Sequence, residues 1–271
     1  MKLGVTTLGC PTWTLDEILA RLPGWGYEGV ELRGLGPDLD LAQSPHFAAS
    51  AAIETTRRQF ADAGLELCGL DTSCTLAEAD PAKRAQQLDD GRRGIDLAAA
   101  LGIPFVRVFG GGDGQDRTEA ARRVADALNM LGDYAAKAGD VAVVLETHDA
   151  FSTGRQVVEA LALVTSPAAG ALWDLHHPYR NGEAPAETFA ALAPYIRTTH
   201  VKDSQPGGTY CLLGDGDVPI PKMLGLLAGG GYDGWITLEW EKRWIPALLD
   251  PDIAFPQYAA KLRQYLAALG T

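Results

Sequence analysis

Residues 141–148 read Val-Ala-Val-Val-Leu-Glu-Thr-His, an apolar run that ends in a carboxylate and an imidazole. Its length and its β-branched residues are typical of a strand buried in a parallel sheet. Seven more short apolar runs share this character, and they lie at 3–7, 29–33, 66–71, 105–110, 170–176, 198–203 and 235–240. Longer amphipathic stretches between them are predicted to be helices, at 15–25, 47–64, 81–102, 117–138, 153–164, 184–195, 220–230 and 252–269.

Start and stop signals support several of these helices. Thr14 precedes Leu15 and two acidic residues, which is typical of an N-cap. Gly24 and Gly102 lie where the first and third helices are predicted to end, and glycine favours such exits.

Eight strand–helix units in strict alternation predict parallel pairing through right-handed crossovers. Eight such units can close the sheet into a barrel, so the predicted fold class is α/β and the predicted fold is a (β/α)8 TIM barrel. A length of 271 residues is typical of that fold. We therefore expect a single barrel domain over residues 1–271. An open doubly wound sheet would place a Gly-rich phosphate loop after its first strand, where this sequence has Leu8-Gly9-Cys10-Pro11.

The charge balance favours a small-molecule partner. There are 23 Lys and Arg against 35 Asp and Glu, a net charge of −12, which repels phosphate backbones and anionic lipids. We expect neither a nucleic-acid nor a membrane partner, and no run approaches the ~18 apolar residues of a membrane span. The four cysteines show no paired spacing, so we expect reduced thiols in a cytoplasmic protein. A homo-oligomer is compatible with the sequence, although no stripe of residues identifies an interface.

Ionisable residues fall at the ends of the last four predicted strands. Barrel enzymes carry their chemistry at the C-terminal ends of strands, where side chains converge. A carboxylate within an apolar strand is costly unless it is paired or ligates a metal. These residues are Glu146, Asp174, His200 and Glu239. Any one of them could be an ordinary ion pair, cap or core histidine, but their joint placement predicts one divalent cation. Mn²⁺ is favoured, with Mg²⁺, Co²⁺ and Zn²⁺ as alternatives.

Alternation along the strands identifies companions of these ligands. His148 follows Glu146 by two positions, and Lys202 follows His200 in the same way. We predict that His148 is catalytic, together with Glu146 and Glu239. The residues predicted to bind substrate are His177, Lys202 and Arg33. For Arg33 the alternative is a salt bridge at the rim of the barrel. Glu241 lies two residues after Glu239 and could equally belong to a solvated loop.

Two other features have a functional and a structural interpretation. Trp13, Trp240 and Trp244 could stack on a substrate ring or could pack the top of the barrel. The glycine-rich segment 110–114 could approach a ligand closely or could be a flexible loop, and it lacks the Lys of a nucleotide-phosphate loop.

The sequence resembles the sugar phosphate isomerase/epimerase superfamily, the xylose isomerase-like TIM barrels. The resemblance covers nearly the whole chain and is carried by 8–13, 26–33, Asp174-x-x-His177, 200–203, 214–217, and 231–234 followed by Leu238-Glu239. It implies that the family's metal ligands correspond to Glu146, Asp174, His200 and Glu239. It also implies that the metal holds adjacent oxygens of a ketose or keto-polyol.

The sequence differs from individual branches of this superfamily at positions that matter for their activity. Ketohexose 3-epimerases carry a Glu where this sequence has Ser152 and an Arg where it has Pro206. Members similar to dehydroshikimate dehydratase share His148 and Lys202. Type IV apurinic endonucleases need further histidines on strands three and four, and these strands contain none.

We therefore expect a metal-dependent isomerase or epimerase of carbohydrate metabolism that acts on a ketose, keto-polyol or sugar phosphate. Proton abstraction next to a carbonyl would proceed through a metal-stabilised enediolate, with Glu146 and Glu239 on opposite sides of the carbon. The alternative is a metal-dependent dehydratase of a keto-polyol such as dehydroshikimate or inosose, in which His148 protonates the leaving hydroxyl. An alternative of another class is a non-catalytic sugar- or metal-binding barrel.

Overall fold

Eight parallel strands form the barrel that the alternation predicts. The structure is a computed structural model that describes residues 1–270. Its strands close in the order β1-β10-β7-β6-β5-β4-β3-β2, which confirms the (β/α)8 fold class. Their bounds are β1 Lys2–Thr6, β2 Gly29–Leu32, β3 Glu66–Thr75, β4 Phe105–Phe109, β5 Ala142–Glu146, β6 Ala169–Asp174, β7 Ile196–Val201 and β10 Trp235–Leu238. A short antiparallel pair, β8 Asp203–Ser204 and β9 Tyr210–Cys211, was not predicted.

The helices follow the predicted pattern with small shifts at their ends. They are α1 Leu15–Trp25, α2 Ser50–Asp62, α3 Pro81–Leu101, α4 Arg117–Ala138, α5 Gly154–Leu161, α6 His177–Arg180, α7 Pro185–Leu192, α8 Ile220–Gly229 and α9 Pro251–Ala268. Thr14 caps α1 with a capping box, and Gly102 ends α3 in the left-handed conformation, as expected. The bounds 15–25 predicted for α1 are confirmed, but the glycine at its exit is Gly26 and not the predicted Gly24. The helix continues through Pro23 and Gly24 until Gly26 adopts a φ of 86°.

The chain divides into two compact units. Unit 1 comprises Met1–Cys68 and the chain from Thr199 onward, and unit 2 comprises Gly69–Thr198. The prediction of one domain over residues 1–271 therefore stays a prediction. Among residues 1–270, no helix combines the length and apolar character needed to cross a membrane.

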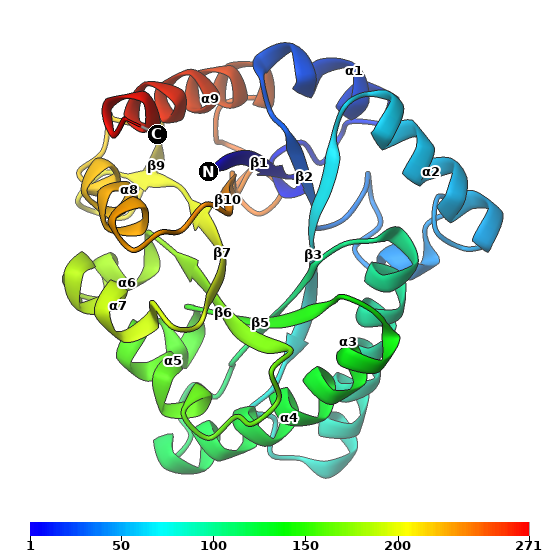
Figure 1. Cartoon of the computed structure of the whole chain (residues 1–271), viewed down its shortest axis with the longest axis vertical. Helices are drawn as coiled ribbons and strands as arrows, with labels where there is room; N and C mark the ends of the chain where they lie inside the picture. Colours follow the sequence, from blue (N-terminus) through cyan, green and yellow to red (C-terminus); the bar gives the residue numbers. More distant parts are fainter. Residues whose placement is uncertain (271) are drawn as a thin grey trace. The chain divides into compact units, whose positions relative to one another are not determined.

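In unit 1, β1 pairs with β10 on one side and with β2 on the other. The helices α1 and α9 lie side by side, as Figure 1 shows in blue and red. Their contact contains an aromatic cluster in which the ring centroids of Trp13 and Phe255 are 5.7 Å apart. An ion pair between Arg21 and Asp252, 2.5 Å apart, adds to this contact. The first and last helices of the chain thus pack together.

The carboxylate of Asp203, in unit 1, organises the Gly-Asp-Gly-Asp segment 214–217. It accepts hydrogen bonds from the backbone N–H groups of Ser204 (2.8 Å), Gly214 (2.8 Å), Gly216 (3.2 Å) and Val218 (3.3 Å). A Cβ at Gly216 would collide with this carboxylate, so the close approach requires glycine. The segment is therefore a turn built around a buried acid.

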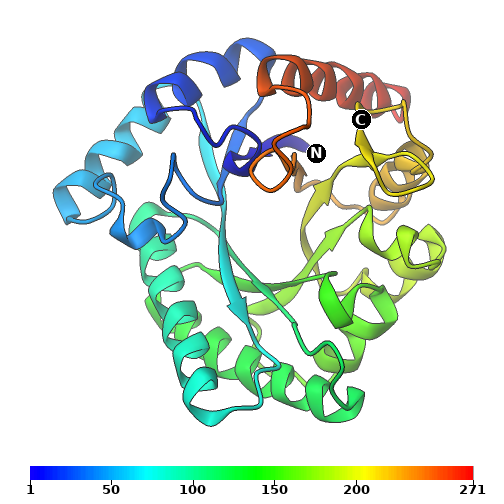
Figure 2. The same cartoon turned by 180° about the vertical axis from the view of Figure 1, so that it is seen from behind.

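In unit 2, β4, β5 and β6 are paired in sequence order. Val106, Val143 and Leu145 on these strands are completely buried, as expected for a parallel sheet. Helix α3 packs against α4, and α5 packs against α7. Figure 2 views the molecule from behind, and α3 and α4 lie next to each other in it. These layers position the ends of β5 and β6, where the predicted site residues lie.

Candidate functional site

In unit 1, His200 on β7 lies between two carboxylates. Its Nε2 is 2.5 Å from Oε1 of Glu31 on β2, and its Nδ1 is 3.5 Å from Oε2 of Glu239. All three side chains are buried. A carboxylate on the far nitrogen of a histidine fixes the orientation of the ring and is the usual partner of a metal-binding histidine. His200 therefore has the surroundings of a ligand that would bind through Nδ1.

Lys202 adds a cation to the same part of unit 1. Its Nζ forms an ion pair with Oε2 of Glu239 and lies 3.2 Å from Oε1 of Glu241. The ring centroid of Tyr210 is 5.9 Å from the ammonium. Lys202 is buried, so the two carboxylates replace the water that would otherwise solvate its charge. The alternation along β7 and beyond β10 thus brings together Lys202, Glu239 and Glu241.

Arg33, also in unit 1, lies directly after β2. Its backbone N–H donates to Oγ1 of Thr7 at 2.8 Å, and its guanidinium is 5.7 Å from the ring centroid of Trp244. Trp244 is 49% exposed, which leaves its ring accessible at the surface. Trp13 and Trp240 are buried, and Trp240 packs 5.7 Å from the ring of Tyr258. For Trp13 and Trp240 the structure supports the packing interpretation.

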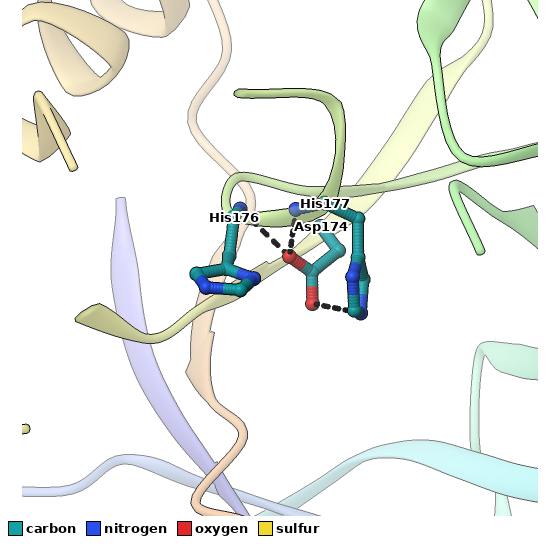
Figure 3. A group of neighbouring side chains, drawn as sticks. All are labelled: Asp174, His176 and His177. Atoms are coloured by element: carbon teal, nitrogen blue, oxygen red, sulfur yellow. Dashed lines mark hydrogen bonds and ion pairs between the residues drawn. The ribbon is translucent and has the colours of Figure 1, made fainter. Parts of the chain in front are cut away.

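In unit 2, Asp174 at the end of β6 begins a turn that carries two histidines (Figure 3). Oδ1 of Asp174 accepts hydrogen bonds from the backbone N–H groups of His176 (2.7 Å) and His177 (3.1 Å). Oδ2 lies 3.7 Å from Nε2 of His177, and the two imidazole rings stand on either side of the carboxylate. Potential ligand atoms of these three residues lie within 4.8 Å of one another. One oxygen is thus used to shape the turn, and the other faces an imidazole.

Glu146, at the end of β5, lies beside a buried arginine. Nε of Arg107 is 3.3 Å from Oε2 of Glu146 and 3.2 Å from Oδ1 of Asp71. The same guanidinium donates to the backbone oxygen of Thr72 at 3.1 Å and covers the ring of Phe109 at 4.0 Å. Burying one cation between two acids compensates the desolvation of all three groups. Arg107 therefore holds Glu146 in place at the end of its strand.

His148 follows Glu146 and contacts an acid that was not predicted. Its Nδ1 is 2.6 Å from Oδ1 of Asp149, and its ring centroid is 4.6 Å from that of Phe109 and 4.8 Å from that of His177. Burial raises the pKa of Asp149, but hydrogen bonds from His148 and from the backbone N–H of Gly111 outweigh it and leave this pKa below its ordinary value. Two residues predicted for different roles, His148 and His177, are thus neighbours.

Four charged residues that hold the predicted site residues were not predicted for this role. They are Glu31, Asp71, Arg107 as an ion-pair partner, and Asp149. A signal existed for Glu31 and Asp71, because each is a carboxylate in a predicted apolar strand. No local signal indicates Asp149, whose role depends on the shape of the turn.

The buried acidic and histidine side chains of both units are of a kind that could hold a metal ion. In unit 1 the structure brings His200, Lys202 and Glu239 together, and in unit 2 it brings Asp174, His177 and His148 together. One site containing Glu146, Asp174, His200 and Glu239 stays a prediction.

Comparisons with known proteins agree with the fold. A family model described as "Xylose isomerase-like TIM barrel" matches residues 19–267. Fructoselysine 3-epimerase of Shigella flexneri is 25% identical over 252 residues, which cover 88% of this chain and 90% of that protein. Inosose dehydratase of Clostridium botulinum (strain Alaska E43 / Type E3) is 30% identical over 166 residues, 53% of this chain and 52% of that enzyme. The crystal structure of a D-tagatose 3-epimerase-like protein superposes with a TM-score of 0.80 at 18% identity, covering 100% of this chain and 98% of that one.

Proposed function

Because this chain belongs to the xylose isomerase-like TIM barrel family, we propose that it is a metal-dependent sugar isomerase or epimerase. Its substrate would be a ketose, a keto-polyol or a sugar phosphate, and the reaction would move a proton at a carbon next to a carbonyl. Similarity to an epimerase along nearly the whole chain supports this proposal. The observation that carries it is the arrangement of His200, which is fixed by Glu31 on one nitrogen and faces Glu239 with the other.

The donor set fits a divalent cation. We propose that Glu146, Asp174, His200 and Glu239 bind one ion, with Mn²⁺ favoured over Mg²⁺, Co²⁺ and Zn²⁺. Three carboxylates and one imidazole would supply oxygen and nitrogen ligands, and all four side chains are buried. When bound, the cation would act as a Lewis acid on a substrate carbonyl and make the neighbouring C–H more acidic.

The protein's own residues would carry the proton and orient the substrate. Glu146 and Glu239 would stand on opposite sides of the reacting carbon, one accepting the proton and the other returning it. Return to the opposite face of the same carbon gives epimerisation, and return to the adjacent carbon gives isomerisation. Arg107 and Lys202 would keep these two carboxylates in position through their ion pairs. The substrate oxygens would be bound by His177, Lys202 and Arg33.

Exchange of substrate hydrogen with solvent tests this function. Protein freed of metal and reloaded with Mn²⁺ is incubated in D₂O with a panel of ketoses, keto-polyols and sugar phosphates, and C–H signals are followed by NMR. We expect deuterium incorporation at a carbon next to the carbonyl of at least one substrate. Tight binding of a sugar without exchange would contradict an enzyme and would support a binding barrel.

Matched variants connect the exchange to the site. Glu239→Gln and Glu146→Gln keep the size of the side chain and remove its basic oxygen, so exchange should fall by about 100-fold or more. Glu54→Gln, on the exposed side of α2, should leave it unchanged. Calorimetric titration with Mn²⁺ should show one ion per wild-type chain and weaker binding after Asp174→Asn. Unchanged Mn²⁺ binding in that variant would contradict the proposed ligand set.

A second candidate function is dehydration of a keto-polyol. The observation that favours it is the pair His148–Asp149 beside His177, because an imidazole held in this way can deliver a proton to a leaving hydroxyl. Similarity to an inosose dehydratase over about half of each chain also supports it. A conjugated enone absorbance appearing with a keto-polyol would favour the dehydratase. Hydrogen exchange without that absorbance would favour the epimerase.

A further inference from the structure

The turn that follows His148 is tied down from several sides in unit 2. Residues Asp149–Phe151 form a short 3₁₀ turn, and the ring of Phe151 is completely buried. A Cβ at Gly110 would collide with this ring, so the glycine-rich segment passes directly against it. Arg117, at the start of α4, donates to the backbone oxygen of Ala150 and lies 4.7 Å from the ring of Phe151. The turn is therefore held by the surrounding structure.

Asp149 within this turn has an unfavourable backbone conformation. Among the residues that the structure describes, it is the one non-glycine residue with a positive φ, at 50°. Such strain persists where neighbouring contacts enforce it, and it concentrates at functional sites. In this conformation the carboxylate lies 2.6 Å from Nδ1 of His148 and accepts a hydrogen bond from the backbone N–H of Gly111. Gly111 itself has a φ of 63°, which explains a glycine at this position.

We propose that Asp149 is a positioning residue that fixes the ring orientation and the tautomer of His148. A carboxylate accepts from Nδ1, so the neutral imidazole carries its hydrogen there and Nε2 becomes the basic nitrogen. The rings of Phe109 and His177 pack against the His148 ring, with centroids 4.6 and 4.8 Å away, and restrict its rotation. Gly110 and Gly111 of the glycine-rich segment thus support His148 through the turn, by packing on Phe151 and by the hydrogen bond to Asp149.

This assignment deepens the proposed function and rests on it for the identity of the substrate. An imidazole whose Nε2 is basic accepts a hydrogen bond from a hydroxyl group, which is the donor that a polyol substrate supplies. The His148 side chain is 35% exposed and the Asp149 side chain is 24% exposed, so a small polyol can reach the pair.

Substitutions at Asp149 can separate orientation from folding. Asp149→Gly removes the acceptor while tolerating the positive φ, and Asp149→Asn keeps an acceptor oxygen and also tolerates this conformation. Asp140→Gly, at an exposed position before β5, is the matched control. The tautomer of His148 is read by ¹⁵N NMR on the metal-free protein at about pH 8, where histidines are largely neutral. The signal is assigned as the one that His148→Gln lacks.

We expect three results from the tautomer and activity measurements. The wild-type protein and Asp149→Asn carry the hydrogen on Nδ1, and Asp149→Gly shifts toward the other tautomer. With an active substrate, kcat of Asp149→Gly falls by about 10–100-fold, and that of Asp149→Asn stays near the wild-type value. Asp140→Gly changes neither measurement.

Two results would overturn the inference: an unchanged tautomer in Asp149→Gly, or an unchanged kcat after the tautomer has shifted. A wild-type protein that is inactive on every substrate would contradict the proposed function. The tautomer comparison, which needs neither metal nor substrate, would then decide the role of Asp149 by itself.

Discussion

Glu239 in unit 1 and Glu146 in unit 2 are both buried carboxylates at strand ends, but different cations neutralise them. Glu239 pairs with the ammonium of Lys202, which Glu241 shares. Glu146 pairs with the guanidinium of Arg107, which Asp71 shares. A guanidinium keeps its charge and its planar geometry, whereas an ammonium can lose its proton and move on a flexible stem. The two predicted proton carriers are therefore held with unequal rigidity.

The largest effect should come from removing the rigid cation. Arg107→Met leaves Asp71 and Glu146 buried without their shared cation, so we expect a loss of about 3–5 kcal/mol in the free energy of unfolding. Urea unfolding measures it. Arg122→Met, at an exposed position on α4, should change stability by less than about 0.5 kcal/mol. Equal effects of the two variants would show that the buried triad does not hold unit 2.

Removing the flexible cation should cost less. Lys202→Met leaves Glu239 and Glu241 without their ammonium, but Glu241 is 15% exposed and retains contact with water. We expect a loss of about 3 kcal/mol in urea unfolding. Lys222→Met on the exposed face of α8 is the control. A loss larger than that of Arg107→Met would reverse the order that the comparison gives.

A smaller effect should appear in acid. The pKa of Asp149 lies below its ordinary value in the folded protein, so this carboxylate contributes stability above its unfolded value of 3.8. That contribution is lost as the pH falls through the folded-state pKa. The stability difference between the wild-type protein and Asp149→Asn should therefore be present near pH 6 and shrink below pH 3.8. Unfolding curves across this range measure it, and a difference that grows toward low pH would contradict the pairing.

The smallest effect is expected from chemical labelling of the cysteines, which compares the two units without any substitution. Burial raises the pKa of Cys74 in unit 2 to about 12, and it raises the pKa of Cys10 in unit 1 still further. A thiol reagent at about pH 8 should therefore modify the half-buried Cys211 first. The other three should react at the rate at which their own unit opens, which mass spectrometry of peptides can follow. Rapid labelling of Cys74 would contradict its burial.

The fold could be predicted because its signals are local. Apolar runs and amphipathic stretches recur at short spacing, and their alternation restricts the topology to a closed barrel. The error at Gly24 has a physical reason, since a helix can continue past a proline and a glycine until a residue adopts the left-handed conformation, as Gly26 does. The short helix α6 was missed because four residues carry no periodicity.

The sequence signals for the candidate site are also local, and the site itself stays a prediction. Position at a strand end indicates Glu146, Asp174, His200 and Glu239, and alternation indicates Lys202. The pairing of Glu31 with His200 joins residues 169 positions apart, so it depends on which strands become neighbours. The role of Asp149 depends on a single backbone angle, which composition and spacing do not reveal.

The order of the chain has a consequence for synthesis on the ribosome. Unit 2 is one uninterrupted stretch, so all of its residues are available once Thr198 has emerged. Unit 1 joins residues 1–68 with the chain from Thr199 onward, and α9 supplies Phe255 and Asp252 to partners on or beside α1. Trp13 and Arg21 therefore gain these partners only after α9 has been translated. Unit 2 can thus be complete in sequence while unit 1 still lacks one of its two segments.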